Sequence, residues 1–127
     1  MDYLISNTLN SKAFVDHENK IARKGMLTII EKNSGEIKQV WSVLNSKVFC
    51  FYNSSNYLNI VKIYRISMLK IKDSLVSPCF FIYYQKDKNQ NFNTTQSIIC
   101  ALNFKEKEHW LKLLKYNQDM NKNYEIN

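Results

Sequence analysis

A chain of 127 residues is long enough for one domain with its own apolar core, and its 45% hydrophobic and 13% aromatic residues are typical of a globular domain. Eighteen Lys and Arg residues against eleven Asp and Glu residues give a net charge of +7. This charge favours an anionic partner such as nucleic acid, a lipid headgroup surface or an acidic peptide, or else simply a basic solvated surface. Because Gly25 and Gly35 are the only glycines, the sequence holds no glycine-rich dinucleotide turn and no P-loop, which excludes most nucleotide chemistry.

The first segment, residues 1–22, has a weak pattern that leaves open a short helix or a tail packed on the domain. It does not place a basic stretch before an apolar one, as a signal peptide does. A run of about 18 apolar residues occurs nowhere in the sequence, so no transmembrane helix is predicted. We therefore expect a cytoplasmic protein.

Short β-branched and aromatic segments, separated by polar turn sequences, predict seven strands in succession. No segment of helical period interrupts them, so the sequence predicts a mainly β domain. The expected strands are residues 25–31, 37–44, 47–52, 59–65, 68–72, 79–85 and 97–102.

The pattern then changes to that of one amphipathic helix. Asn103 and Glu106 have the spacing of a capping box, in which each side chain bonds the other residue's backbone N–H. We expect the apolar stripe of this helix to close the open end of the β structure, with Trp110 as a buried plug. The stripe runs from Phe104 through Trp110, Leu113, Leu114 and Asn117, and Lys105, Lys107, Lys112 and Lys115 are expected on the solvent face.

Three cysteines, Cys50, Cys79 and Cys100, each lie in an apolar, strand-like segment. They form no C-x-x-C pair and no cluster with histidine, so no metal site is predicted. We expect three buried, reduced thiols in a cytosolic protein.

The two histidines, His17 and His109, have no nucleophile and no orienting carboxylate at a recognisable catalytic spacing. The sequence therefore predicts no enzyme activity and no cofactor.

Four segments, taken in order, resemble the pleckstrin-homology (PH) domain family over most of residues 23–117. They are "RKGMLTI" with Gly25 in the first strand, "KQVWSVL" in the second, "SKVFCFY" in the third and "FKEKEHWLKLL" in the closing helix. The resemblance implies a partly open seven-stranded barrel of two near-orthogonal antiparallel sheets, capped by a C-terminal α-helix. It also implies a domain over residues 23–118, with a tail at 119–127, and structural roles for Gly25 and Trp110.

The resemblance also gives expectations about ligands. PH domains that hold phosphoinositides usually place a Lys late in the first strand and an Arg before the second-strand aromatic residue. The matching positions here are Ile29 and Val40. Without these cations a phosphorylated inositol ring loses its charge-assisted clamp, so a stereospecific inositide pocket is not expected.

At other positions where the family carries basic residues, this sequence has lysines. The resemblance places the loops that carry them together, at the end of the domain away from the helix. Lysines beside loop aromatics suit a shallow site for an anionic lipid surface. The alternative is that these lysines are only solvated, with Glu31, Glu36 and Asp87 cancelling part of their charge. The expected lipid-binding residues are Lys32, Lys38, Lys86, Lys88, Tyr57 and Phe92.

A narrower resemblance is to the apical PH-domain proteins of apicomplexan parasites, which implies phosphatidic acid binding at secretory organelles. Those proteins carry an N-terminal lipidated glycine, whereas Asp2 follows Met1 here. A second hypothesis is a protein-interaction module that receives a peptide strand between the fifth strand and the helix. RNA binding is the weakest of the three hypotheses, because the sequence contains no RNP motif. Nucleic acid is therefore not expected as a partner. The sequence thus predicts a lipid-binding module on a membrane surface.

Overall fold

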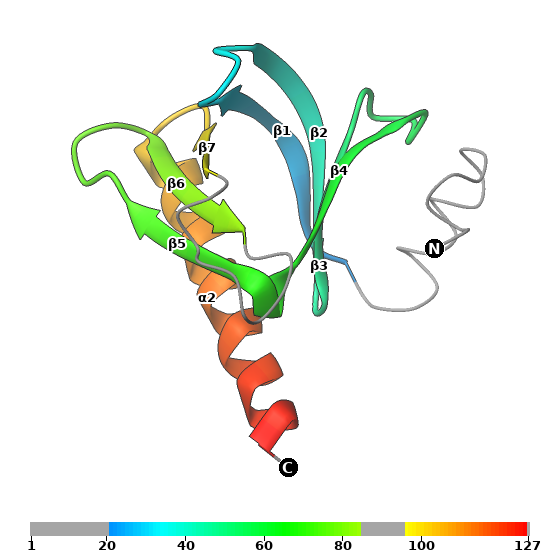
Figure 1. Ribbon diagram of the computed structural model, residues 1–127, viewed down its shortest axis with the longest axis vertical. Coiled ribbons are helices and arrows are strands. Elements are labelled where there is room, and N and C mark those ends of the chain that lie inside the picture. Colours follow the sequence, from blue (N-terminus) through cyan, green and yellow to red (C-terminus); the bar gives the residue numbers. More distant parts are fainter. Residues whose placement is uncertain (1–20, 85–95, 127) are drawn as a thin grey trace.

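The computed structural model describes residues 21–84 and 96–126, which form seven strands, one short 3-10 helix and one α-helix (Figure 1). The predicted mainly β architecture, with its closing helix, is confirmed. The elements are β1 (Ile21–Glu31), β2 (Ile37–Asn45), β3 (Val48–Tyr52), β4 (Ile60–Arg65), η2 (Ile66–Met68), β5 (Leu69–Asp73), β6 (Cys79–Tyr84), β7 (Gln96–Cys100) and α2 (Phe104–Ile126).

Most strand bounds differ from the predicted ones by one or two residues, and the largest differences are at the start of β1 and the end of α2. β1 begins at Ile21 rather than at Gly25, and its side chains alternate between partly buried and exposed from the start, as expected for a strand with one wet face. Helix α2 continues through residue 118, the predicted end of the domain, to Ile126. Most of the predicted tail is therefore part of the closing helix.

The strands form one antiparallel sheet in the order β4-β3-β2-β1-β7-β6-β5. β1 pairs with β2 along most of its length and with β7 from Thr28 to Glu31, so it belongs to both halves of the sheet. The two sheets expected from the family resemblance are thus halves of one continuous sheet that curls round (Figure 1). The outermost strands, β4 and β5, are joined through η2 and leave the barrel open between them.

The core fills the inside of this curled sheet and is closed by α2. Trp110 is 2% exposed, and the centroid of its ring lies 5.7 Å from that of Phe49. Its buried position agrees with the sequence prediction. A Cβ atom built on Gly25 would lie 3.6 Å from the Trp110 ring, an ordinary van der Waals distance, so alanine would also fit there. The surrounding core includes Leu27, Ile29, Val40, Leu44, Phe51, Tyr64, Ile66, Phe80, Ile82, Ile99 and Leu114.

The buried face of α2 is rotated from the predicted one. Asn103 does cap the helix, since its Oδ1 accepts the Glu106 N–H at 2.9 Å. Phe104, however, is 49% exposed, whereas Lys107, expected on the solvent face, is 2% exposed. Lys107 lies three residues before Trp110 and therefore on the same helix face, where its ammonium group bonds the Asp73 carboxylate and the Ser77 carbonyl.

The prediction of three reduced cysteines is wrong for two of them. Cys79 and Cys100 are opposite one another in the β6–β7 pair and form a disulfide. Cys50 is a free thiol with no exposed surface, as predicted. Burial raises the pKa of Cys50 to about 12, against a smaller effect of a hydrogen bond with Tyr52, so the thiol stays protonated.

Within the described part of the chain, no helix combines the length and apolar character that crossing a bilayer requires. The same residues contain no group of three or more His, Cys, Asp or Glu side chains placed to hold a metal ion.

Candidate functional site

The turn between β1 and β2 carries the first predicted lipid-binding lysine. Gly35 adopts a φ of +72°, and its N–H donates to the Glu31 carbonyl at 2.7 Å. The Glu31 N–H donates in turn to the Glu36 carbonyl at 2.9 Å. This positive φ is readily available only to glycine, and the resulting tight turn presents Lys32 to solvent.

A cleft of about 360 Å³ lies between this turn and β4. Two lysines and two glutamates line it, together with small polar and aliphatic side chains. The lining residues are Ile29, Glu31, Asn33, Ser34, Glu36, Lys38, Val61 and Lys62.

Each lysine of the cleft is paired with a glutamate. Lys62 Nζ lies 2.6 Å from Glu31 Oε1, and Lys38 Nζ lies 3.6 Å from Glu36 Oε1. The Ser97 hydroxyl donates to the other Glu31 oxygen at 3.0 Å. Burial disfavours the charged form of Lys62, but the hydrogen bond and charge of Glu31 together with the contact to Tyr64 outweigh it, so the pKa of Lys62 is raised. The positive charge of the cleft is thus balanced internally.

The two positions that would carry an inositide clamp are part of the core. Ile29 is 2% exposed and Val40 has no exposed surface. A charged side chain at Val40 would have to be buried among apolar neighbours, at a cost that an unpaired cation does not recover. Among residues 21–84 and 96–126, the cleft therefore has no unpaired cation at the depth where a phosphorylated inositol ring would need it.

The predicted site residues are only partly brought together. Lys32 and Lys38 lie on one hairpin, Lys32 at the turn and Lys38 at the cleft, with 42% of its side chain exposed. The Tyr57 ring does not project from its loop: it is 6% exposed and stacks edge-on against Tyr52, with centroids 5.0 Å apart. Lys86, Lys88 and Phe92 lie outside the described residues, as does His17.

His109 lies on the solvent side of α2, as expected for a surface residue. Its Nδ1 is 3.6 Å from Glu106 Oε2, one helical turn away. Glu106 is also bonded by Arg23 at 2.8 Å, so its carboxylate links the helix to β1. The Glu106 carboxylate thus lies between Arg23 and His109 at the surface.

Sequence reasoning missed the exposed apolar side chains. Ile37, beside the β1–β2 turn, is 69% exposed, and Leu75 and Val76, between β5 and β6, are 79% and 86% exposed. At Leu75 and Val76 the only sequence signal is that this apolar pair lies inside the polar turn "DSLVSP". Such a pair is usually interpreted as the end of a strand, and the structure is needed to place it at a turn.

No protein-family model matches the sequence, and no curated protein matches it. Solved structures do match in fold. The PH domain of ORP8 has a TM-score of 0.64 at 17% identity, covering 77% of this chain and 97% of that chain. The PH domain of Slm1, in complex with inositol-4-phosphate, has a TM-score of 0.62 at 12% identity, covering 76% and 95%. The chain therefore has a PH-like fold.

A third similar structure is the DH/PH fragment of PDZRhoGEF in complex with human RhoA, with a TM-score of 0.67 at 16% identity. The similar region covers 90% of this chain but 33% of the PDZRhoGEF fragment, so this protein spans about a third of the length of such DH/PH fragments. Identities this low establish the fold alone. They give no support to the narrower resemblance to apicomplexan proteins.

Proposed function

We propose that this protein is a non-enzymatic module that docks on membranes through anionic phospholipid headgroups, and that it favours phosphatidic acid over phosphoinositides. The observation that carries this proposal is the charge arrangement around the β1–β2 hairpin. Lys32 is exposed and outside the ion pairs of the cleft, on the same hairpin as the exposed Ile37, while the cleft lysines are held by Glu31 and Glu36. Of the lysines that the structure describes here, an anionic surface would meet an unpaired one at the rim of the cleft and only paired ones inside it.

The preference among lipids follows from this shallow charge. A phosphoinositide gains affinity from several cations fixed around its ring, and the buried Ile29 and Val40 do not supply them. Phosphatidic acid has a small headgroup with an exposed phosphomonoester, and a nearby lysine favours its doubly charged form. A few lysines at a surface, each contributing about 1 kcal/mol near anionic lipid, would therefore suffice for weak, reversible attachment.

The expected location is peripheral, on a membrane surface. The cytoplasmic prediction relied in part on three reduced cysteines, and the Cys79–Cys100 disulfide removes that support, because such bonds are rare in reducing compartments. Attachment through headgroup charge works on any anionic leaflet, so the lipid proposal does not depend on the compartment.

The alternative, a peptide added as a strand beside β5, is disfavoured by a specific contact. The Gln118 side-chain amide on α2 donates to the Leu69 carbonyl at 2.6 Å and to the Ile66 carbonyl at 3.3 Å. The Leu69 carbonyl lies at the start of β5, an outermost strand of the sheet where an incoming strand would begin to pair, and the Ile66 carbonyl lies just before it in η2. The helix thus already occupies part of that edge.

Vesicle co-sedimentation tests the proposal. The protein is mixed with phosphatidylcholine vesicles, alone or containing phosphatidic acid, phosphatidylserine or a bisphosphorylated inositide. We expect binding in the order phosphatidic acid, phosphatidylserine, phosphatidylcholine, with no strong preference for the inositide. Lys32→Glu with Lys38→Glu should weaken binding, whereas Lys112→Glu with Lys115→Glu, an equal charge change on exposed positions of α2, should weaken it far less. Tight binding to the inositide alone, or no binding to any anionic vesicle, would refute the proposal.

A further inference from the structure

The turn between β5 and β6 holds two adjacent aliphatic side chains out in water. Leu75 is 79% exposed and Val76 is 86% exposed. Leu75 also has a φ of +70°, in the left-handed region that branched, bulky residues rarely adopt. Single exposed apolar residues are common, but an adjacent pair at the tip of a hairpin, in a costly backbone conformation, is a feature that folding alone does not favour.

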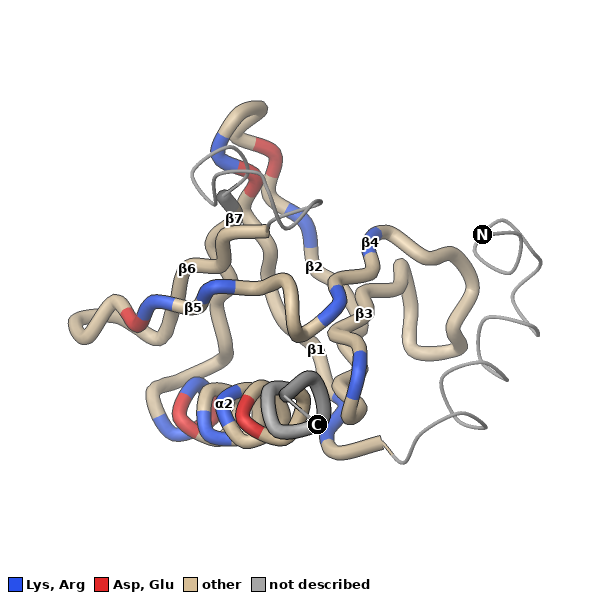
Figure 2. Tube along the Cα trace, turned by 60° about the horizontal axis from the view of Figure 1, so that its bottom comes forward, with Lys and Arg blue, Asp and Glu red and all other residues tan. Residues whose placement is uncertain are grey.

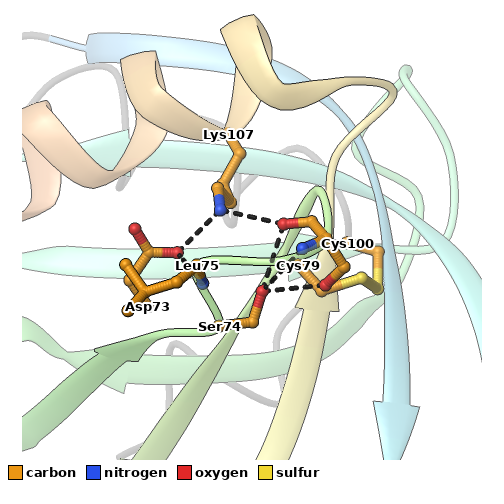
Figure 3. Close-up of polar contacts among 7 residues, drawn as sticks. Asp73, Ser74, Leu75, Cys79, Cys100 and Lys107 are labelled. Carbon is orange, nitrogen blue, oxygen red and sulfur yellow. Dashed lines mark hydrogen bonds and ion pairs between the residues drawn. A yellow bond between two sulfur atoms is a disulfide. The ribbon is translucent and has the colours of Figure 1, made fainter.

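Hydrogen bonds fix the shape of this turn (Figure 3). The Ser74 and Ser77 hydroxyl groups lie 2.8 Å apart, and the Ser77 N–H donates to the Ser74 hydroxyl at 3.2 Å. The Leu75 N–H donates to Asp73 Oδ1 at 3.2 Å. Lys107 on α2 reaches the same turn, with its Nζ 2.8 Å from the Ser77 carbonyl and 2.7 Å from Asp73 Oδ1.

The base of the hairpin is tied to the rest of the barrel as well. The Cys79–Cys100 disulfide joins the first residue of β6 to the last residue of β7. The Ala101 N–H donates to the Pro78 carbonyl at 2.9 Å. The exposed pair is therefore presented by a turn that is anchored at both ends, so holding it in one orientation on a surface costs little further conformational entropy.

More apolar surface lies next to this turn. The Lys107 Nζ that bonds the Ser77 carbonyl also lies 4.9 Å from the centroid of the Phe104 ring, which is 49% exposed. Leu102, next in the chain to Ala101, is 86% exposed. We call these four residues the hairpin surface: Leu75, Val76, Leu102 and Phe104.

Three exposed lysines lie on the elements that flank the hairpin surface, and one exposed acidic residue, Glu108, lies a helical turn after Phe104. Lys70 and Lys72 are both exposed and, two residues apart on β5, lie on the same face of that strand. Figure 2 shows the basic positions of β5 beside the acidic position at the end of the strand. Asp73, the acidic residue that follows them, is engaged by Lys107. Lys105 at the start of α2 is also exposed. Among the described residues no ion pair neutralises Lys70, Lys72 or Lys105.

From this arrangement we propose that the β5–β6 turn is a second membrane contact, in which Leu75 and Val76 insert into the interface of an anionic bilayer while Lys70 and Lys72 meet its phosphates. A convex tip with two small aliphatic side chains suits a deformable lipid surface. A protein interface instead buries about 800 Å² per side around central aromatic or arginine anchors, whereas the projecting tip holds two aliphatic side chains and Phe104 lies behind it on α2. The contact rests on the proposed function for its ligand, but it lies at a different turn from Lys32 and Ile37.

Removal of the aliphatic pair is the first test, with vesicles of phosphatidylcholine containing phosphatidic acid. The variant carries Leu75→Asn and Val76→Ser, and asparagine tolerates the left-handed backbone at position 75. The matched control carries Tyr116→Ser and Met120→Ser, two exposed apolar residues on α2. We expect the hairpin variant to bind about tenfold more weakly or worse, because it loses two insertable side chains, and the control to bind as the parent does.

Depth of insertion is the second test and does not depend on a loss of binding. An environment-sensitive dye is attached at Val76→Cys and, in a separate control protein, at Tyr116→Cys; the native thiol Cys50 is buried and does not compete. We expect a blue shift, and quenching by lipid-borne quenchers, at position 76 on phosphatidic acid vesicles and neither effect at position 116. Lys70→Gln with Lys72→Gln should reduce vesicle binding. It should also reduce the fraction of labelled protein whose dye emission shifts to the blue.

The outcomes separate this contact from the proposed function. If the parent binds anionic vesicles while the hairpin variant binds equally well and position 76 shows no shift, the hairpin contact is refuted and the function stands. If the parent binds no anionic vesicle, both are refuted. Weaker binding of the hairpin variant together with a shift at position 76 supports both.

Discussion

Lys107 Nζ lies 2.7 Å from Asp73 Oδ1, and this bond joins the beginning of α2 to the end of β5. The lysine side chain is 3% exposed and the aspartate side chain 35%. The pair is thus a buried cation held by a carboxylate at the surface. It orients the helix that closes the barrel and also the turn that follows Asp73.

Replacement of Lys107 by Ala should lower the free energy of unfolding by about 1–3 kcal/mol, because the Ser77 carbonyl and the Asp73 carboxylate lose their shared donor. Lys105→Ala, on the solvent face of the same helix turn, should change it by less than about 0.5 kcal/mol. Urea denaturation of both variants measures the difference. Equal stability of the two would contradict the role assigned to Lys107.

The same pair predicts a pH dependence. The hydrogen bond from Lys107 holds the pKa of Asp73 below its ordinary value, against a smaller effect of burial. Because the folded-state pKa is lower than the unfolded one, the stabilisation is complete above the unfolded pKa of about 3.9 and is lost as pH falls through the folded pKa. In denaturation at a series of acid pH values, the advantage of the parent over Asp73→Asn should shrink below about pH 4. An advantage that is constant down to the lowest pH would rule this linkage out.

Trp110→Ala should destabilise the protein by about 3–5 kcal/mol, the usual range for deleting an aromatic side chain from a core. The ring is 2% exposed and packs on Phe49, with the Arg23 guanidinium 5.2 Å from its centroid. Thermal melts compare the variant with the parent and with Trp41→Phe, a more conservative change at a partly buried position. A melt of the Trp110 variant that matches the parent would show that the helix does not close the core.

Thiol labelling should distinguish the three cysteines. In the folded, unreduced protein no cysteine should react quickly, because burial raises the pKa of Cys50 to about 12 and the other two are bonded. A mild reductant should expose Cys79 and Cys100 only, and Cys50 should react after unfolding. Mass spectrometry of the labelled peptides reads out each site. Rapid labelling of Cys50 in the native state would contradict the structure.

Membrane binding should be strongly salt-dependent, since attraction between exposed charges is screened over about 8 Å at physiological ionic strength. Lys86→Glu with Lys88→Glu, in the predicted loop between the sixth and seventh strands, should abolish vesicle binding and leave the thermal melt unchanged. Lys112→Glu with Lys115→Glu again serves as the charge-matched comparison. Binding that persists at high salt would point to insertion alone.

The strands were predictable because each is a short β-branched or aromatic segment between polar turns, and local sequence decides such elements. The burial of Lys107 was less apparent. Its spacing from Trp110 and Leu114 places it on the buried stripe, but a lysine is normally assigned to solvent, and only the position of Asp73 on another strand explains its burial. The disulfide was hidden for a similar reason. Pairing Cys79 with Cys100 requires the register between β6 and β7, which the sequence of the connecting segment does not define.

The pairing of β1 with β7 has a consequence for how the protein reaches its native state. Thr28 is opposite Cys100 in the sheet, so the barrel closes only when segments from the two ends of the domain meet. Closing that long loop costs conformational entropy before the β1–β7 pairing contributes any stabilisation. Barrels dominated by such distant contacts fold in about milliseconds to seconds, far more slowly than helical bundles of equal size. Until β7 pairs with β1, this edge of β1 is exposed and can pair with other chains. The pairing of β7 therefore protects β1 from aggregation.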